Sequence, residues 1–162
     1  MVIGGTGMLA GLCRSLAARG HKLSVLARRP ADLGLGVRCF QCDYTDSELF
    51  ELAIRSAISA MGKPEVLITW IHSSAPDAAE LAARLAKPSR HLRILGSAGA
   101  RRPTPGPSEV GGERIILGFA LDQDTSRWLT HAEICAGVLR AFDHPSPESI
   151  VGTIEPWDRR PS

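Results

Sequence analysis

The stretch Val2-Ile3-Gly4-Gly5-Thr6-Gly7-Met8-Leu9-Ala10 leaves an apolar strand, turns on glycines and opens a helical pattern. Gly4 permits a tight turn, Gly7 lets a phosphate approach the backbone, and Ala10 is small enough for close packing of helix against strand. The helix start directs free N–H groups and a positive dipole end at a pyrophosphate. A glycine turn needed only for packing is the alternative. The turn therefore predicts dinucleotide binding by Gly4, Gly5, Thr6, Gly7, Met8 and Leu9.

Beyond the turn, short apolar runs alternate with longer runs at helical spacing. Strands are expected at 22–27, 37–42, 65–72 and 91–95. Asp46 or Ser47 is expected to cap the helix after the third strand, and Ser74, with Pro76 in the first turn, the helix after the fourth. The alternation predicts an α/β fold, a single doubly wound (Rossmann-type), mostly parallel sheet with helices on both faces.

The pattern changes after the fifth strand. Residues 97–112 are rich in proline and glycine and are expected to form a flexible loop, either a functional lid or a disordered segment. A sixth strand is expected at 114–121, running either parallel, by a crossover, or antiparallel, as a hairpin. Thr130-His131-Ala132-Glu133 matches a capping box that opens a helix through Ala141. A last strand at 150–154 and an exposed tail at 155–162 complete the expected domain.

The length and composition of the chain exclude several classes of protein. A chain of 162 residues suits one domain with a real core, and a net charge of +2 gives no case for nucleic acid or an anionic membrane. No apolar run approaches a bilayer span and no leader is evident, so a cytoplasmic protein is expected. The pair Cys39 and Cys42 has C-x-x-C spacing but lies in a strand, which favours packing over redox or metal roles. A homodimer is compatible with such a fold.

The choice of cofactor is read at the end of the second strand. An acidic residue there would hold the ribose hydroxyls of NAD(H), but the chain has Ala27-Arg28-Arg29-Pro30. A guanidinium matches a 2′-phosphate in charge and fork geometry. Arg28 and Arg29 therefore favour NADP(H) over NAD(H), and a pair of solvated surface arginines is the alternative.

These residues resemble an atypical, shortened NAD(P)-binding Rossmann domain of the short-chain dehydrogenases/reductases. The resemblance rests on the glycine turn, on Cys42-Asp43-Tyr44-Thr45-Asp46 and on Ile94-Leu95-Gly96-Ser97. It implies that Asp43 and Tyr44 face the adenine, that residues 69–73 lie beside the ribose, and that Ser97 stands where relatives keep a catalytic serine.

The chain departs from that family in one respect. Catalytic members carry Tyr-x-x-x-Lys on a helix after the fifth strand, whereas the single tyrosine here is Tyr44, with Glu48 four residues on. Two hypotheses follow. The first is an NADP(H)-binding oxidoreductase without the usual acid–base pair. The second is a non-catalytic dinucleotide-binding or sensing module that acts through a protein partner.

Polar groups that follow the fourth and fifth strands are the candidates for chemistry, because ligands bind at the carboxyl edge of such sheets. His72, Ser73 and Ser97 can orient a substrate or relay a proton there, and His72 and Ser73 also border the cofactor. The alternative is that His72 binds backbone or ribose and that the serines cap turns. Less specific candidates are a phosphate clamp (Arg101, Arg102), a substrate wall (Trp128) and a core or cofactor wall (Trp70), while His131 is expected at the surface.

Overall fold

The structure is a computed structural model that describes residues 1–72, 74–75, 77–98, 112–122 and 125–161. The expected loop at 97–112 lies mostly outside the described residues, as do Ser73, Arg101 and Arg102. The elements, in chain order, are β1 (Val2–Ile3), α1 (Ala10–Ala18), β2 (Leu23–Ala27), β3 (Val37–Gln41), α2 (Ser47–Met61), β4 (Val66–Trp70), α3 (Ala78–Ala86), β5 (Arg90–Gly96), β6 (Gly112–Leu117), β7 (Phe119–Asp122), β8 (Thr125–Trp128), α4 (His131–Asp143), β9 (Glu148–Val151) and the 3-10 helix η2 (Trp157–Arg159).

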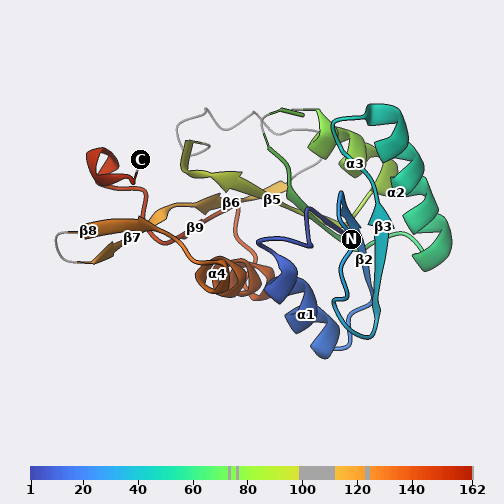
Figure 1. Cartoon of the computed structure of the whole chain (residues 1–162), viewed down its shortest axis with the longest axis horizontal. Helices are drawn as coiled ribbons and strands as arrows, with labels where there is room; N and C mark the ends of the chain where they lie inside the picture. The colour runs from blue at the N-terminus through green and yellow to red at the C-terminus, as the bar shows by residue number, and fades with distance from the viewer. Residues whose placement is uncertain (73, 76, 99–111, 123–124, 162) are drawn as a thin grey trace.

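Seven strands form one sheet in the order β3-β2-β1-β4-β5-β6-β9, and every pair of neighbours is parallel. This confirms the doubly wound fold, with the strand order reversing between β1 and β4 (Figure 1). The direction of the sixth strand is now settled, since β6 lies parallel to β5 with Ile94 opposite Ile115. All carboxyl ends therefore meet at one edge, and the glycine turn leaves β1 there.

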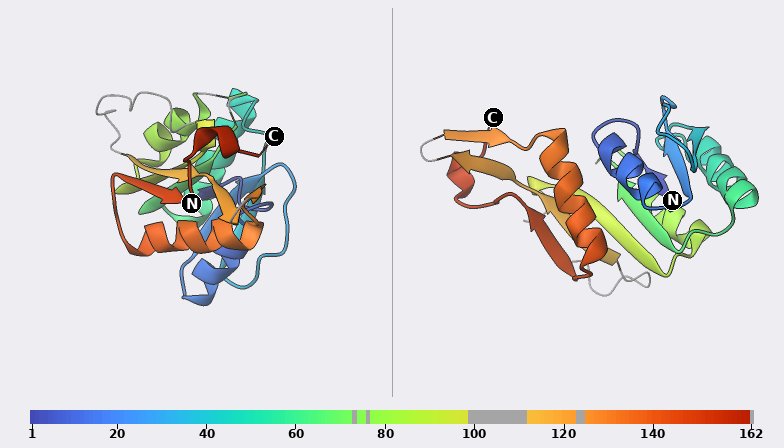
Figure 2. Two further views of the ribbon diagram at one scale, coloured as in Figure 1. Left: turned by 90° about the vertical axis from the view of Figure 1, so that its left-hand side faces the viewer. Right: turned by 90° about the horizontal axis from the view of Figure 1, so that it is seen from below.

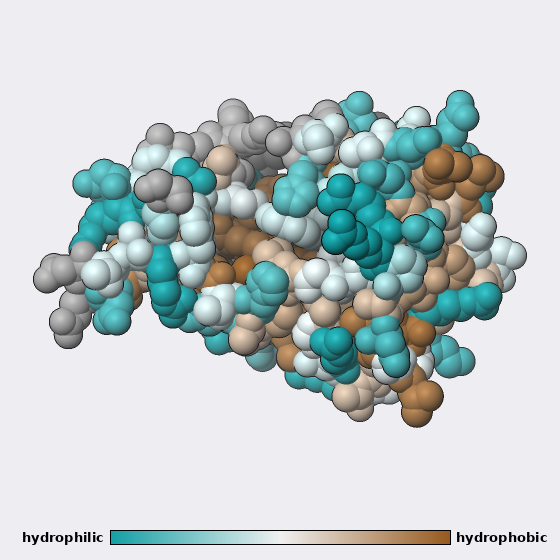
Figure 3. All heavy atoms as spheres, viewed as in Figure 1, coloured by the Kyte–Doolittle hydropathy of each residue, from teal (hydrophilic) through white to brown (hydrophobic). Residues whose placement is uncertain are grey.

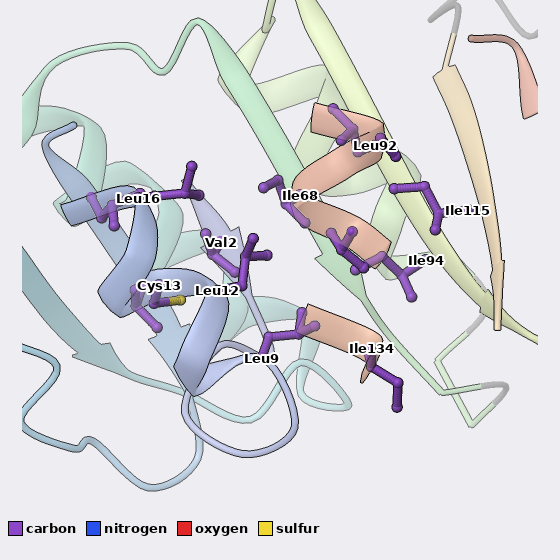
Figure 4. Packing of buried hydrophobic residues seen from close by; sticks show 14 of the residues in the cluster. Val2, Leu9, Leu12, Cys13, Leu16, Ile68, Leu92, Ile94, Ile115 and Ile134 are labelled. Atoms are coloured by element: carbon purple, nitrogen blue, oxygen red, sulfur yellow. The ribbon is translucent and has the colours of Figure 1, made fainter. Parts of the chain in front are cut away.

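Helices cover both faces of the sheet, α1 and α4 on one side and α2 and α3 on the other (Figure 2). Each pair seals its own apolar cluster. On the first face, apolar side chains of α1 with its N-cap Leu9, of α4 and of the strands form one cluster, and Figure 4 labels Leu12, Ile68, Ile94 and Ile134 among its members. On the second face, α2 and α3 pack over β1, β2 and β4. Among the described residues, no helix combines the length and apolar character needed to cross a bilayer.

The end of α4 is tied to the sheet by Arg90. Its guanidinium forms a two-pronged ion pair with Glu113 of β6 and donates to the carbonyl oxygens of Ala141 (2.8 Å) and Phe142 (2.6 Å). Arg90 also caps the last carbonyls of the helix, where a cation is favoured. The pairing lowers the pKa of Glu113 and raises that of Arg90. This joint holds three elements together at the edge opposite the glycine turn.

A buried polar pair lies next along β5. His91 is 3% exposed, and one of its ring nitrogens lies 3.0 Å from the hydroxyl of Thr69 on β4. Burial, together with the charge of Arg93, lowers the pKa of His91 from 6.5 to about 4. The imidazole is therefore neutral in the folded protein at neutral pH.

The predicted strand at 114–121 is wrong in one respect, because it breaks at Gly118. A Cβ at Gly118 would overlap the carbonyl of Thr153, and the chain passes close to that segment before turning away as β7. β7 pairs antiparallel with β8, so a hairpin that the sequence did not predict stands apart from the main sheet (Figure 1). The last strand also ends earlier than 150–154, because Gly152 has φ +77° and Thr153 pairs with Phe119 instead.

Helix starts were predicted unevenly. Asp46 accepts a hydrogen bond from the backbone N–H of Leu49, and Thr130 with Glu133 forms the full capping box, so both caps are confirmed. The cap at Ser74 is wrong, because α3 begins after Asp77. Two successive backbone turns, from Ala75 to His72 and from Ala78 to Ala75, carry the chain from β4 to this later start.

Candidate functional site

The glycine turn is built against the end of β4. Gly4 has φ +81°, its N–H donates to the carbonyl oxygen of Leu26 (2.9 Å), and a Cβ on it would lie 2.6 Å from the carbonyl oxygen of Trp70. A side chain at this position would be strained by the backbone and would clash with β4. Gly4 therefore has the turn-making role that the sequence predicts, and Trp70 forms a wall of the turn.

Close packing is provided by two other glycines. A Cβ on Gly5 would lie 2.8 Å from Val25 and 3.0 Å from the sulfur of Cys13, and one on Gly11 would lie 3.2 Å from the sulfur of Cys135 on α4. Ala10, to which the sequence analysis assigned close packing of helix against strand, is partly buried and packs against the core on this face. Gly11, which the sequence analysis did not single out, adds a close contact between α1 and α4.

The rest of the turn is open toward the edge of the sheet. A Cβ on Gly7 would meet no atom within 4 Å. No described residue accepts a hydrogen bond of good geometry from the backbone N–H groups of Thr6, Gly7, Met8 or Leu9. Free amides at a helix start, beside open space over a glycine, are what a pyrophosphate requires. The turn fits a dinucleotide phosphate group.

The ends of β2 and β3 form an open groove of about 640 Å³ that is shared with α2. Arg28 and Asp43 both line it, while Arg29 is exposed beside them. The carboxylate of Asp43 accepts from the backbone N–H (3.0 Å) and the hydroxyl (2.7 Å) of Thr45. These bonds, helped by the charge of Arg28, hold the pKa of Asp43 below its usual value. An acceptor and a cation thus face the same groove.

Three aromatic side chains meet at the end of β4. The hydroxyl of Tyr44 accepts from the backbone N–H of His72 (3.4 Å), and the rings of Trp70 and His72 lie edge to face at 5.2 Å. Tyr44 also makes an edge-to-face contact with Phe50 of α2. His72 is exposed. Tyr44 and His72 are thereby brought together, and their placement at the adenine and beside the ribose stays a prediction.

Ser97 has a partner that the sequence did not predict. It is 3% exposed, and its hydroxyl accepts a hydrogen bond from Nε of Arg160 (2.8 Å). The guanidinium of Arg160 lies over the rings of Trp128 (4.9 Å) and Trp157 (5.3 Å). The segment expected to be an exposed tail therefore docks on the end of β5. Trp157, an aromatic residue in an otherwise polar segment, was the signal available in the sequence.

The cysteines do not form a metal or redox centre among the described residues. No group of three or more His, Cys, Asp or Glu side chains there is placed to hold a metal ion. Burial raises the pKa of Cys13 to about 12 and that of Cys42 to about 11. Cys39 donates to the carbonyl oxygen of Ala31 (3.3 Å). Burial and a raised pKa disfavour the reactive thiolate at Cys13 and Cys42.

The sequence matches no known family, but the fold is similar to that of solved proteins. No protein-family model matches the sequence, and no curated protein matches it. A short-chain dehydrogenase/reductase from Serratia marcescens is 15% identical with a TM-score of 0.68, over 93% of this chain and 95% of that one. A sorbitol-6-phosphate 2-dehydrogenase from Erwinia amylovora is 15% identical with a TM-score of 0.66, over 92% and 95%. An apo SCOR enzyme from Clostridium thermocellum is 14% identical with a TM-score of 0.71, over 99% and 93%. The chain has the fold of the short-chain dehydrogenases/reductases.

Proposed function

We propose that this chain binds a nicotinamide dinucleotide at the carboxyl edge of its sheet and acts as an oxidoreductase. The observation that carries the proposal is the turn at Gly4, which packs against Trp70 while leaving the space over Gly7 and the adjoining amides open. A turn required only for packing would have no need of that opening. The fold shared with the solved dehydrogenases supports the proposal, because open parallel sheets bind ligands at the carboxyl ends of their strands.

NADP(H) is the cofactor that the edge favours. The adenosine end would lie over the ends of β2 and β3, where Arg28 borders the groove and Asp43 keeps its carboxylate ionised. A 2′-phosphate would add two forked hydrogen bonds to a guanidinium that the ribose hydroxyl of NAD(H) cannot make. Arg29, exposed beside it, adds positive charge.

The residues near the expected nicotinamide end define what chemistry the protein itself can add. When bound, the reduced cofactor would supply hydride to an acceptor. The chain has no Tyr-x-x-x-Lys pair to deliver a proton, so His72, exposed at the end of β4, and Ser97, at the end of β5, are the candidate catalytic residues. Acceptors of the flavin or quinone kind need the least help from such groups.

Two measurements test the proposal. Titration with NADPH and NADH should show saturable binding of both, with NADPH at least tenfold tighter. NADPH consumption at 340 nm against a panel of carbonyl, flavin and quinone acceptors should then show turnover that His72→Ala and Ser97→Ala lower. Tight NADPH binding without turnover would leave the second candidate, a non-catalytic sensing module, for which the docked C-terminal segment beside Ser97 offers a ligand-responsive surface. If neither nucleotide bound, both functions would be lost.

A further inference from the structure

Arg160, rather than Ser97, is the polar group that reaches the surface at the end of β5. Ser97 is 3% exposed, whereas Arg160 is an exposed residue whose Nε donates to the serine hydroxyl at 2.8 Å. The hydroxyl thus lies beneath the guanidinium and holds it. Whatever binds at this end of the edge meets Arg160 before it meets Ser97.

The guanidinium is oriented without being neutralised. Trp128 at the end of β8 and Trp157 in η2 present their rings to it at 4.9 and 5.3 Å, and aromatic faces attract a cation without cancelling its charge. No acidic side chain of the described residues pairs with Arg160. Asp158, the nearest acid along the chain, forms no ion pair with Arg160 among the described residues, and Glu155 accepts from the backbone N–H of Trp157 (3.1 Å). Within the part of the chain that the structure describes, the positive charge of Arg160 is therefore held in place without an acidic partner.

This charge lies at the end of β5, on the same carboxyl edge of the sheet from which the glycine turn leaves β1. β7, β8 and η2 lie together beyond the ends of β6 and β9, and Figure 3 shows a hollow with apolar surface between them and the rest of the molecule. With Nε bound to Ser97, the two terminal nitrogens of Arg160 stay available as a fork. Such a fork matches the two oxygens of a carboxylate or phosphate.

We propose that Arg160 binds an anionic oxygen group, a carboxylate or a phosphate, on the substrate that is acted on at this edge. The proposal deepens the proposed function and rests on it, because the anion is a substrate only if the chain is an oxidoreductase. Ser97, named above as a candidate catalytic residue, then acts instead as a positioning residue that holds the guanidinium, and the two indoles keep the plane of the guanidinium. The anion fixes the substrate at Arg160, leaving its reactive end to extend along the edge toward the cofactor.

Binding of simple anions tests this site independently of turnover. Trp128 and Trp157 contact the guanidinium, so tryptophan fluorescence should change saturably with pyruvate, with inorganic phosphate, or with both, and not with the neutral ketone acetone. The anion that binds more tightly identifies the carboxylate or the phosphate class. Arg160→Gln should raise the dissociation constant at least tenfold, and Arg160→Lys by less. Arg14→Gln, which removes the same charge from an exposed position on α1, should leave it unchanged.

Binding of NADPH, measured on the same variants, separates this proposal from the proposed function. Arg160→Gln should bind NADPH within twofold of wild type, which also shows that the variant is folded, while the KM for anionic acceptors rises at least tenfold and the KM for neutral acceptors does not. Normal NADPH binding with no anion response, or with an equal response in Arg160→Gln, would overturn the anion site alone. Loss of NADPH binding in the wild type would overturn the proposed function and, with it, the assignment of the anion as substrate.

Discussion

Substituting Gly7 by alanine should separate folding from cofactor binding. A Cβ at Gly7 meets no atom within 4 Å, and the residue does not have a positive φ, so the methyl group fits the folded backbone. Removing a glycine also reduces the entropy of the unfolded chain, so the free energy of unfolding should change by less than about 1 kcal/mol or rise slightly. The same methyl group would occupy the space that a phosphate needs. We expect NADPH affinity to fall ten- to a hundredfold, or about 1.4–2.8 kcal/mol.

Gly4→Ala is the matched contrast three residues away. At φ +81° an alanine costs about 1–2 kcal/mol from the backbone alone. Its Cβ would also lie 2.6 Å from the carbonyl oxygen of Trp70, so β1 and β4 would have to separate. The total loss of stability should reach about 2–4 kcal/mol. Urea unfolding followed by circular dichroism gives the stabilities, and NADPH titration gives the affinities. Wild-type NADPH affinity in Gly7→Ala would refute the phosphate site, and unfolding of Gly7→Ala would refute the geometry of the turn.

Three further outcomes follow from the fold and the groove. Arg90→Ala should lower the free energy of unfolding by about 3 kcal/mol, because Glu113 loses its ion-pair partner. The difference in urea midpoint between wild type and Arg90→Ala should shrink as the pH falls below the usual pKa of a glutamate, because Glu113 then becomes protonated. The pKa of His91 is about 4 in the folded protein against an ordinary 6.5, so the contribution of neutral His91 to the free energy of unfolding is complete above pH 6.5. About 3 kcal/mol of that free energy is lost as the pH falls toward 4. The urea midpoint should therefore drop more between pH 7 and pH 4.5 for wild type than for His91→Gln, and equal drops would contradict this. Arg28→Ala should weaken NADPH at least tenfold while NADH changes less than twofold, and equal losses for both in parallel titrations would remove the 2′-phosphate role.

Local signals in the sequence were sufficient for most of the fold. The capping box at Thr130 and the cap at Asp46 need only residues within one helical turn. The strands are visible as short apolar runs in the sequence. The hairpin β7–β8 was missed because the apolar run at 114–121 continues through Gly118. Its break depends on Thr153, which is distant in sequence.

The candidate site could be predicted only in the part that one continuous segment of the chain forms. The glycine turn is complete within one segment, so its glycines could be assigned from spacing. The contact between Ser97 and Arg160 joins segments 63 residues apart, and the hairpin that carries Trp128 had not been predicted. An arginine in a short terminal segment resembles any solvated charge until that segment is seen to dock.

The docked C-terminal segment adds a second positive charge, that of Arg160, to the carboxyl edge of the sheet. In the order β3-β2-β1-β4-β5, Arg28 follows β2 and Ser97 with Arg160 follows β5, which is three strand spacings or roughly 14 Å across the sheet. The open amides of the glycine turn lie between them, after β1. Positive charge thus stands on both sides of the glycine turn, although the net charge of the chain is only +2. An elongated ligand with anionic groups at its ends and its middle matches that order better than one with a single charged group. A bound dinucleotide and an anionic substrate, placed end to end along the edge, would together satisfy all three positions.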